Sequence, residues 1–449
     1  MKHLTITGNK LALLLMFVAA SVCFSCGDSN DEPSVTPASV QLTVKLATEY
    51  NKVSLGKVKI TLRNTATGKE TKVITDAGGS ALVSNLPVDM YDVTATYSMS
   101  AADFKTATGL DAEKDSVLFS ASATGVQLVP GKATALNLEL NTATTDNFVL
   151  KTIYYAGSDR VKAASDYDQF IEIYNNSSKT LYADSLCIAI TTMNRYGNGH
   201  PYQSQRYVYL EDGRYDWSKA QGMPENIDAN NAYYYANMVF MIPGKGKTYP
   251  VKPGESIVIA SFAQNFKASF TNLRGDVIKP QAPELTVDLS HADFEGAYER
   301  TKEMTNPAVP DLIIVHPGNN TYMRLSNNGK EGYVLFRSSD PSKYPLYLYP
   351  TKPNTQGSNS QFMQIPVATV IDAVEVISPT NDGYVAPKAI QKKDDAGYTW
   401  AKSGTYSSMA ITRKVSRLDG TRRVLQDINN STLDFVEMKA EPKAFAPQN

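Results

Sequence analysis

Residues 168–177, with the sequence DQFIEIYNNS, are the stretch that best defines the fold. Successive side chains of an extended chain point to opposite faces, so Ile171 and Ile173 fall on one face. Phe170 and Tyr174 fall on the other. Apolar residues repeated in this way are typical of a β-strand. The Asn-Asn-Ser sequence that follows is typical of a turn, because Asn side chains bond to nearby backbone. The stretch therefore predicts a strand that ends in a turn.

Further strand patterns lie on both sides of this stretch. Residues 148–157, FVLKTIYYAG, precede it, and residues 181–190, LYADSLCIAI, follow it. Nearer the N-terminus, three segments alternate apolar and polar residues with a period of two: 40–46, 58–62 and 136–140. The polar run at 141–146 predicts a domain boundary. Together these patterns predict an all-β fold in two domains.

The first domain shows an ordered set of motifs. The strand at 58–62 is followed by TG at 67–68, TDAGG at 75–79, LP at 86–87 and YDV at 91–93. This order resembles a carboxypeptidase-regulatory or Cna-B-type domain, and the resemblance covers residues 39–141. It implies an immunoglobulin-like or prealbumin-like β-sandwich that serves as a spacer.

The second domain carries a separate resemblance. Its segments at 148–157, 170–175 and 181–190 are similar to the opening strands of the lamin-tail domain, an immunoglobulin-like sandwich. Later motifs follow the order of an uncharacterised family of Bacteroidota surface lipoproteins with lamin-tail relatives: MIPGKG at 241–246, YPVKPGESIVI at 249–259, DLSHADFE at 288–295, RK at 413–414 and DINNSTLDF at 427–435. The resemblance spans residues 147–440 and implies a larger lamin-tail-like sandwich with loop insertions. Such proteins are often encoded beside TonB-dependent outer-membrane receptors, which implies capture or hand-over of a nutrient.

The first residues of the chain predict where the protein works. An apolar run from Leu11 to Val22 closes on CFSC at 23–26, which is typical of a secretory signal cleaved directly before a cysteine that receives lipid. We expect a signal peptide at 1–25, lipid on Cys26 and a flexible acidic tether at 26–38. A serine- and acid-rich run after such a cysteine resembles the Bacteroidota signal for export to the outer face of the outer membrane. The expected location is therefore the outer membrane, lipid-anchored and facing the extracellular side.

The composition and charge argue against several functions. The chain has 449 residues, with 44 Lys and Arg against 45 Asp and Glu, and no basic block, so we expect no nucleic-acid partner. Cys23 leaves with the signal and Cys26 takes lipid, so Cys187 is the remaining cysteine. Its strand-like surroundings predict a buried thiol, and with no second cysteine left we expect no intramolecular disulfide.

The motifs of known enzyme and metal sites are absent from the sequence. It contains no HExxH, no GxSxG and no Cys/His cluster at metal-ligand spacing. Residues 242–248, IPGKGKT, resemble a P-loop, but position 241 is Met where the motif needs glycine. We therefore expect no catalytic residues, no metal and no cofactor.

One region is richer in Tyr, Arg and Asn than a plain sandwich requires. Aromatic faces combined with amide and guanidinium donors suit the binding of sugars, protein partners or an aromatic chelate. The alternative is that these tyrosines only cover an edge of the sandwich. The candidate ligand contacts in this region are Tyr196, His200, Tyr202, Arg206, Tyr207 and Trp217.

The sequence thus favours a non-catalytic surface lipoprotein. We predict a binding or accessory subunit of a TonB-dependent nutrient uptake system, with a TonB-dependent receptor and a small-molecule or glycan ligand as partners. An adhesive or structural surface protein that binds glycan or a host surface is the first alternative. A hydrolase with an unrecognised site is the second.

Overall fold

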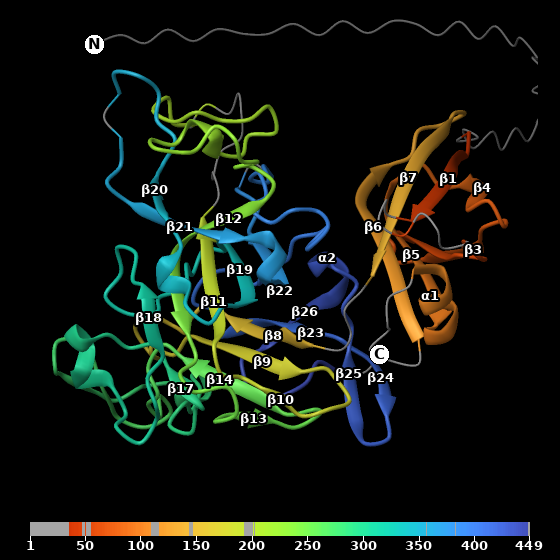
Figure 1. Ribbon diagram of the computed structural model, residues 1–449. Coiled ribbons are helices and arrows are strands. Elements are labelled where there is room, and N and C mark those ends of the chain that lie inside the picture. The colour runs from red at the N-terminus through yellow and green to blue at the C-terminus, as the bar shows by residue number, and fades with distance from the viewer. Residues whose placement is uncertain are drawn as a thin grey trace, which may run out of the picture. The chain divides into compact units, whose positions relative to one another are not determined.

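The computed structural model describes residues 36–46, 50, 55–108, 116–142, 147–192, 201, 203–355, 357–381 and 383–447 (Figure 1). Within these residues the protein is all-β, as the sequence predicts, with several sheets and few short helices. The strands fall into a first group before residue 143 and a second group after residue 147. Most of the predicted boundary at 141–146 lies outside the described residues.

The first group of strands surrounds one apolar core. The alternation predicted at 40–46 is confirmed, because Val40, Leu42 and Val44 are buried while their neighbours are less so. The strands pair in the order β3-β2-β5-β6-β7-β1-β4, with β1 parallel to β7. The elements are β1 (Ala38–Leu46), β2 (Lys59–Asn64), β3 (Glu70–Ile74), β4 (Ser80–Leu86), β5 (Met90–Ser100), α1 (Ala101–Thr108), β6 (Ser116–Gln127) and β7 (Ala133–Thr142).

The second group is larger and contains many short elements. Its strands are β8 (Phe148–Tyr154), β9 (Phe170–Asn175), β10 (Leu181–Tyr182), β11 (Leu186–Thr192), β12 (Tyr233–Met241), β13 (Pro250–Val251), β14 (Ser256–Ala260), β15 (Phe270–Thr271), β16 (Val277–Ile278), β17 (Phe294–Glu295), β18 (Ile313–His316), β19 (Lys330–Arg337), β20 (Leu346–Leu348), β21 (Gln361–Pro366), β22 (Val370–Ile377), β23 (Met409–Arg413), β24 (Val415–Asp419), β25 (Arg422–Leu425) and β26 (Phe435–Lys439). Its helices are η2 (Trp217–Lys219), η3 (Pro283–Leu285), η4 (Glu299–Met304), η5 (Pro341–Lys343), η6 (Val367–Thr369) and α2 (Ser431–Asp434).

Two large sheets of this second group pack together as a sandwich. One has the order β20-β21-β12-β11-β19-β22, with β18 beside β12, and the other has the order β17-β14-β9-β8-β23-β26. Side chains from both sheets share one core, including Ile171 and Ile173 of β9 and Ile188 of β11. On the opposite face of β9, Phe170 and Tyr174 enter two other apolar clusters. The two faces predicted for this strand are confirmed, and both are buried because further segments cover the outer one.

The prediction of one continuous strand at 181–190 is wrong. The segment divides into β10 and β11, which belong to different sheets. The break lies at Asp184 and Ser185, where Ser185 has a positive φ of 60°. The Asp184 carboxylate accepts hydrogen bonds from the backbone N–H groups of Gly246, Thr248 and Tyr249, each at 2.9 Å. A buried carboxylate is stable only while it keeps its hydrogen-bond donors. The chain therefore turns at Asp184, and the strand breaks there into β10 and β11.

The same contact shows what the P-loop-like segment does. Its backbone N–H groups surround an anion, but the anion is the side chain of Asp184. Burial opposes ionisation of this carboxylate, yet the N–H groups of Tyr249 and Thr248 hold its pKa to about 2. The segment therefore fixes a turn of the sandwich.

A buried arginine links the two sheets. Arg413 of β23 contacts Asp372 of β22 through Nη2 and Oδ2 at 2.8 Å, and its Nη1 lies 3.0 Å from Asp427 and 3.5 Å from Asp434. Its Nε donates to the carbonyl oxygen of Leu150 at 3.0 Å. None of these four charged side chains is more than 2% exposed. A buried carboxylate needs a cation to compensate its charge, and Arg413 is the cation beside all three carboxylates. Arg413 therefore fixes how the two sheets pack.

Candidate binding pocket

An aromatic cluster covers the start of β12. Trp217 of η2 stacks on Tyr235 of β12, with ring centroids 3.9 Å apart and planes 9° from parallel. Phe362 of β21 packs against the same indole ring at 5.4 Å. Trp217 is only 8% exposed, so the ring is mainly a packing element. The cluster gives this corner of the sheet a small core of its own.

Polar side chains hold η2 against the loop before β12. Asp216 accepts hydrogen bonds from the backbone N–H and hydroxyl of Ser218 and from Asn230, through the same Oδ1 atom. The Asn230 Oδ1 in turn accepts the backbone N–H of Trp217 at 2.8 Å. Asp is a favoured helix N-cap for this reason, since its oxygen satisfies a free N–H group. This network places Trp217 and the residues before it next to β12.

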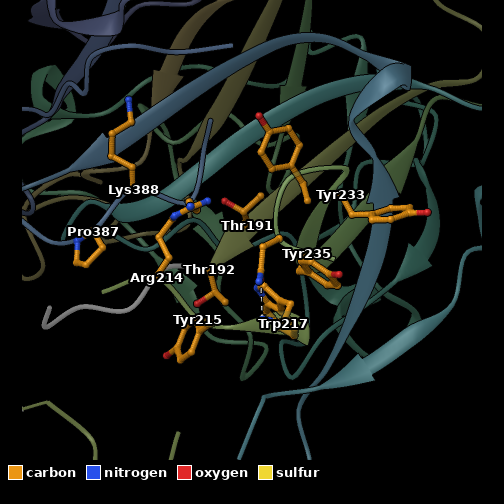
Figure 2. A pocket seen from close by; sticks show the side chains of 12 residues that line it. Thr191, Thr192, Arg214, Tyr215, Trp217, Tyr233, Tyr235, Pro387 and Lys388 are labelled. Atoms are coloured by element: carbon orange, nitrogen blue, oxygen red, sulfur yellow. Dashed lines mark hydrogen bonds between the residues drawn. The ribbon is translucent and has the colours of Figure 1, made fainter. Parts of the chain in front are cut away.

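A pocket opens beside this cluster, and we call it the β12 pocket (Figure 2). It is small, with a volume of about 40 Å³. Strand β11, the segment before η2, strand β12 and a later loop all contribute to it. Its lining residues are Thr191, Thr192, Arg214, Tyr215, Trp217, Asn230, Tyr233, Tyr234, Tyr235, Pro387, Lys388 and Ala389.

The two cations of the pocket are held differently. Lys388 donates to the carbonyl oxygens of Asp395 and Gly397, and Figure 2 shows its amine turned away from Thr191. The Nε of Arg214 donates to Asp212 at 2.8 Å, and the guanidinium extends toward Thr191 in Figure 2. Arg214 therefore supplies the cationic group that faces the pocket.

A row of half-buried tyrosines continues from the pocket, and we call it the tyrosine shelf. Its members are Tyr207, Tyr209, Tyr215 and Tyr349. The ring centroid of Tyr215 lies 5.7 Å from Tyr207, 5.4 Å from Tyr209 and 4.8 Å from Tyr349. Since Tyr215 also lines the β12 pocket, pocket and shelf form one continuous surface.

The phenols of the pocket are hydrogen-bonding groups with little acid–base reactivity. Burial raises the pKa of Tyr234 well above its ordinary value, and it does the same for Tyr215 and Tyr235. The Tyr234 hydroxyl donates to Asp394 at 2.5 Å. An enzyme that uses an acid or base needs a pKa near the working pH. The lining residues include no Asp, Glu, His, Cys or Ser. The arrangement can bind a ligand through rings, phenols and a guanidinium.

The sequence predictions of site residues have mixed outcomes. Cys26, Tyr196, His200 and Tyr202 lie outside the described residues. Trp217 lines the pocket, and Tyr207 lies on the shelf beside it. Arg206 is exposed and is not part of the pocket lining.

Sequence reasoning did not single out Arg214 or residues 387–389. Arg214 lies between the tyrosines of the candidate region, so composition pointed to its surroundings without distinguishing it. Residues 387–389 reach the pocket from a distant part of the chain, and no local pattern marks them.

Other residues with possible chemistry have structural surroundings. Cys187 is free and buried in β11, as predicted, and burial raises the pKa of its thiol to about 12. No cluster of three or more His, Cys, Asp or Glu side chains suited to a metal occurs in the described part of the chain. Among the helices of those same residues, none has the length and apolar character needed to cross a bilayer.

The fold and the pocket define a class of protein: an all-β sandwich protein with an aromatic pocket and an arginine in its wall. Residues 252–442 match the family described as protein of unknown function (DUF4876). This agrees with the predicted resemblance to an uncharacterised family, while the lamin-tail likeness stays a prediction. No curated protein matches the chain.

The chain is similar to several solved structures. A DUF4876 family protein from Bacteroides thetaiotaomicron is 25% identical, with a TM-score of 0.49 and coverage of 89% of this chain and 95% of that one. A candidate adhesin from Bacteroides ovatus is 11% identical, with a TM-score of 0.18 and coverage of 78% and 89%. BcpA, the major pilin subunit of Bacillus cereus, is 14% identical, with a TM-score of 0.15 and coverage of 74% and 96%.

Proposed function

We propose that the protein is a non-catalytic binding protein, anchored by lipid on Cys26 at the outer face of the outer membrane. Its β12 pocket and tyrosine shelf contact a ligand or a protein partner. The partner we favour is a TonB-dependent receptor, to which the protein is an accessory subunit in nutrient uptake. The lamin-tail-like character of the larger sandwich and the spacer role of the first domain belong to the same proposal.

The chemical make-up of the pocket carries this proposal. Rings, phenols and one guanidinium surround a small concave space, which is the usual composition of a recognition site. A hydrolase would need two titratable groups that converge on a substrate atom. The pocket lining holds neither a carboxylate nor an imidazole, and the phenols stay protonated at neutral pH. These features favour binding over the hydrolase alternative.

The anchoring part of the proposal rests on the sequence of the first residues. The apolar run is too short for a helix that crosses about 30 Å of hydrocarbon, which favours a cleaved signal. Lipid on Cys26 and the polar tether after it would hold the folded domains at the membrane surface. Substitution of Cys26 by Ser removes the lipid site and should release the protein from the membrane fraction.

The test is a gentle pull-down of the lipidated protein from native membranes, with mass spectrometry of every retained protein. Recovery of an outer-membrane receptor supports the uptake role. Tyr207→Ala, on the shelf, should reduce that recovery, while Arg206→Gln, an exposed neighbour outside pocket and shelf, should not. Recovery of no receptor, together with binding to a glycan or host-protein array, would instead favour the adhesive alternative.

A further inference from the structure

We propose that the β12 pocket recognises a carboxylate, with Arg214 as the binding residue, and that the carboxylate belongs to an acidic sugar whose ring lies on the tyrosine shelf. This inference rests on the proposed binding function and names the class of ligand. Three observations support it: the hydrogen-bond donors of Arg214, the size of the pocket and the position of Tyr215.

Arg214 has donors to offer. Its Nε and backbone N–H groups both serve Asp212, at 2.8 Å and 3.0 Å. Its two Nη groups make no hydrogen bond to any residue that the structure describes. The side chain is 29% exposed, so solvent and ligand can reach it. A planar guanidinium with two free Nη groups matches the two oxygens of a carboxylate.

The size of the pocket limits what can enter it. Its volume of about 40 Å³ is far below the roughly 300 Å³ or more of a site that encloses a whole small ligand. A pocket of this size favours a small terminal group such as a carboxylate, with the body of the ligand next to the pocket.

The tyrosine shelf provides that outer surface. Tyr215 lines the pocket, and its ring contacts Tyr207 and Tyr349 on the shelf. The ring faces are apolar and the hydroxyls polar, which suits a sugar that has an apolar ring face and hydroxyls at its edge. A carboxylate on the sugar would reach Arg214 while the sugar ring lies against the tyrosine shelf.

Asp212 is the group that opposes this binding. Its carboxylate lies on the Nε side of Arg214 and is 54% exposed, so it partly neutralises the guanidinium. It leaves the Nη side of the guanidinium free. Asp212→Asn should therefore tighten carboxylate binding, while Arg214→Gln should weaken it. Damage to the fold would weaken binding in both variants. Opposite changes in affinity would therefore show that the pocket recognises the charge of the ligand.

The experiment is a ligand-observed NMR titration of the full-length lipidated protein in detergent with glucuronate, glucose and benzoate. We expect glucuronate to bind at least about tenfold more tightly than glucose, since hydrogen bonds to a charged group are the stronger ones. Arg214→Gln should remove this advantage, Asp212→Asn should increase it, and Arg206→Gln should leave it unchanged.

Three results would overturn the inference. The first is no binding of glucuronate, and the second is glucuronate binding that Arg214→Gln leaves intact. The third is benzoate binding as tight as glucuronate binding, which rejects the sugar while keeping the carboxylate. The membrane pull-down tests the proposed function independently of this inference, because recovery of a receptor does not depend on which small ligand binds.

Discussion

Two arginines of the larger sandwich have opposite surroundings. Arg413 lies between the sheets at 2% exposure, with Asp372, Asp427 and Asp434 within 3.5 Å of its nitrogens. Arg214 lies at the β12 pocket at 29% exposure, with a single carboxylate beside it. The neighbouring carboxylates raise the pKa of the Arg413 guanidinium against the effect of burial. The number of partners and the access of water decide whether the same side chain holds the fold or is available to a ligand.

The largest effect is expected at Arg413. Arg413→Met removes the cation and leaves three buried carboxylates without it, which should lower the free energy of unfolding by about 3–5 kcal/mol. Urea unfolding followed by circular dichroism measures the change. Lys414→Met is the matched control, because the neighbouring Lys414 is half-buried and donates to the carbonyl oxygen of Leu433. Equal urea midpoints for the two variants would show that Arg413 does not fix the sheets.

A somewhat smaller effect is expected at the aromatic cluster. Trp217→Ala should cost about 3 kcal/mol, because it leaves a cavity between Tyr235 and Phe362. Trp400→Ala is the control, since Trp400 is half-buried and stacks on Tyr398 at 5.6 Å. Thermal unfolding ranks the two variants. If Trp400→Ala costs as much, Trp217 is not the packing centre that its burial indicates.

The two arginines also show what could be predicted from sequence. Alternation at 170–175 predicts both faces of β9, because strand periodicity is a local property. The motifs at 413–414 and 427–435 were recognised as a family pattern, yet their physical role depends on Asp372, 41 residues before Arg413. The sequence around Arg413 contains no pattern from which the contact with Asp372 could be predicted. The break between β10 and β11 was missed for the same reason, since Asp184 contacts residues more than 60 positions later.

In the candidate site, too, local features could be predicted from the sequence and long-range contacts could not. Composition marked a region rich in Tyr and Arg, and it contains Trp217 and the shelf residue Tyr207. The sequence favoured Arg206 over Arg214 as a candidate contact, although both lie among tyrosines and no local pattern distinguishes them. Folding separates them by placing Thr191 and Lys388 next to Arg214 in the pocket wall.

A buried acid that pairs with no arginine among the described residues extends the comparison of the two arginines. Asp168 is fully buried, and burial raises its pKa to about 7 against the hydrogen bonds from Ser158 and Tyr154. A raised pKa means that the folded state binds the proton more tightly than the unfolded state. The contribution to stability is complete below about pH 4 and is lost as the pH rises toward 7.

Asp168→Asn should therefore remove part of the pH dependence. The free energy of unfolding of the wild type should fall relative to the variant by up to about 1.4 kcal/mol per pH unit between pH 4 and 7. Urea unfolding at several pH values measures the difference in free energy of unfolding between the two proteins. The contributions of the other titrating groups are the same in both and cancel in this difference. A constant difference would mean that Asp168 is ionised throughout and has a cation or donor that compensates it.

The smallest effect on stability is expected at Arg214, and this separates the two arginines most clearly. The ion pair of Arg214 with Asp212 is partly exposed on both sides, so Arg214→Gln should cost less than about 1 kcal/mol. The same variant should lose the preference for glucuronate. Thermal unfolding and the NMR titration, made on the same preparation, give both values. A loss of stability close to that of Arg413→Met would mean that Arg214 also holds the fold, and its loss of binding would then carry no information about recognition.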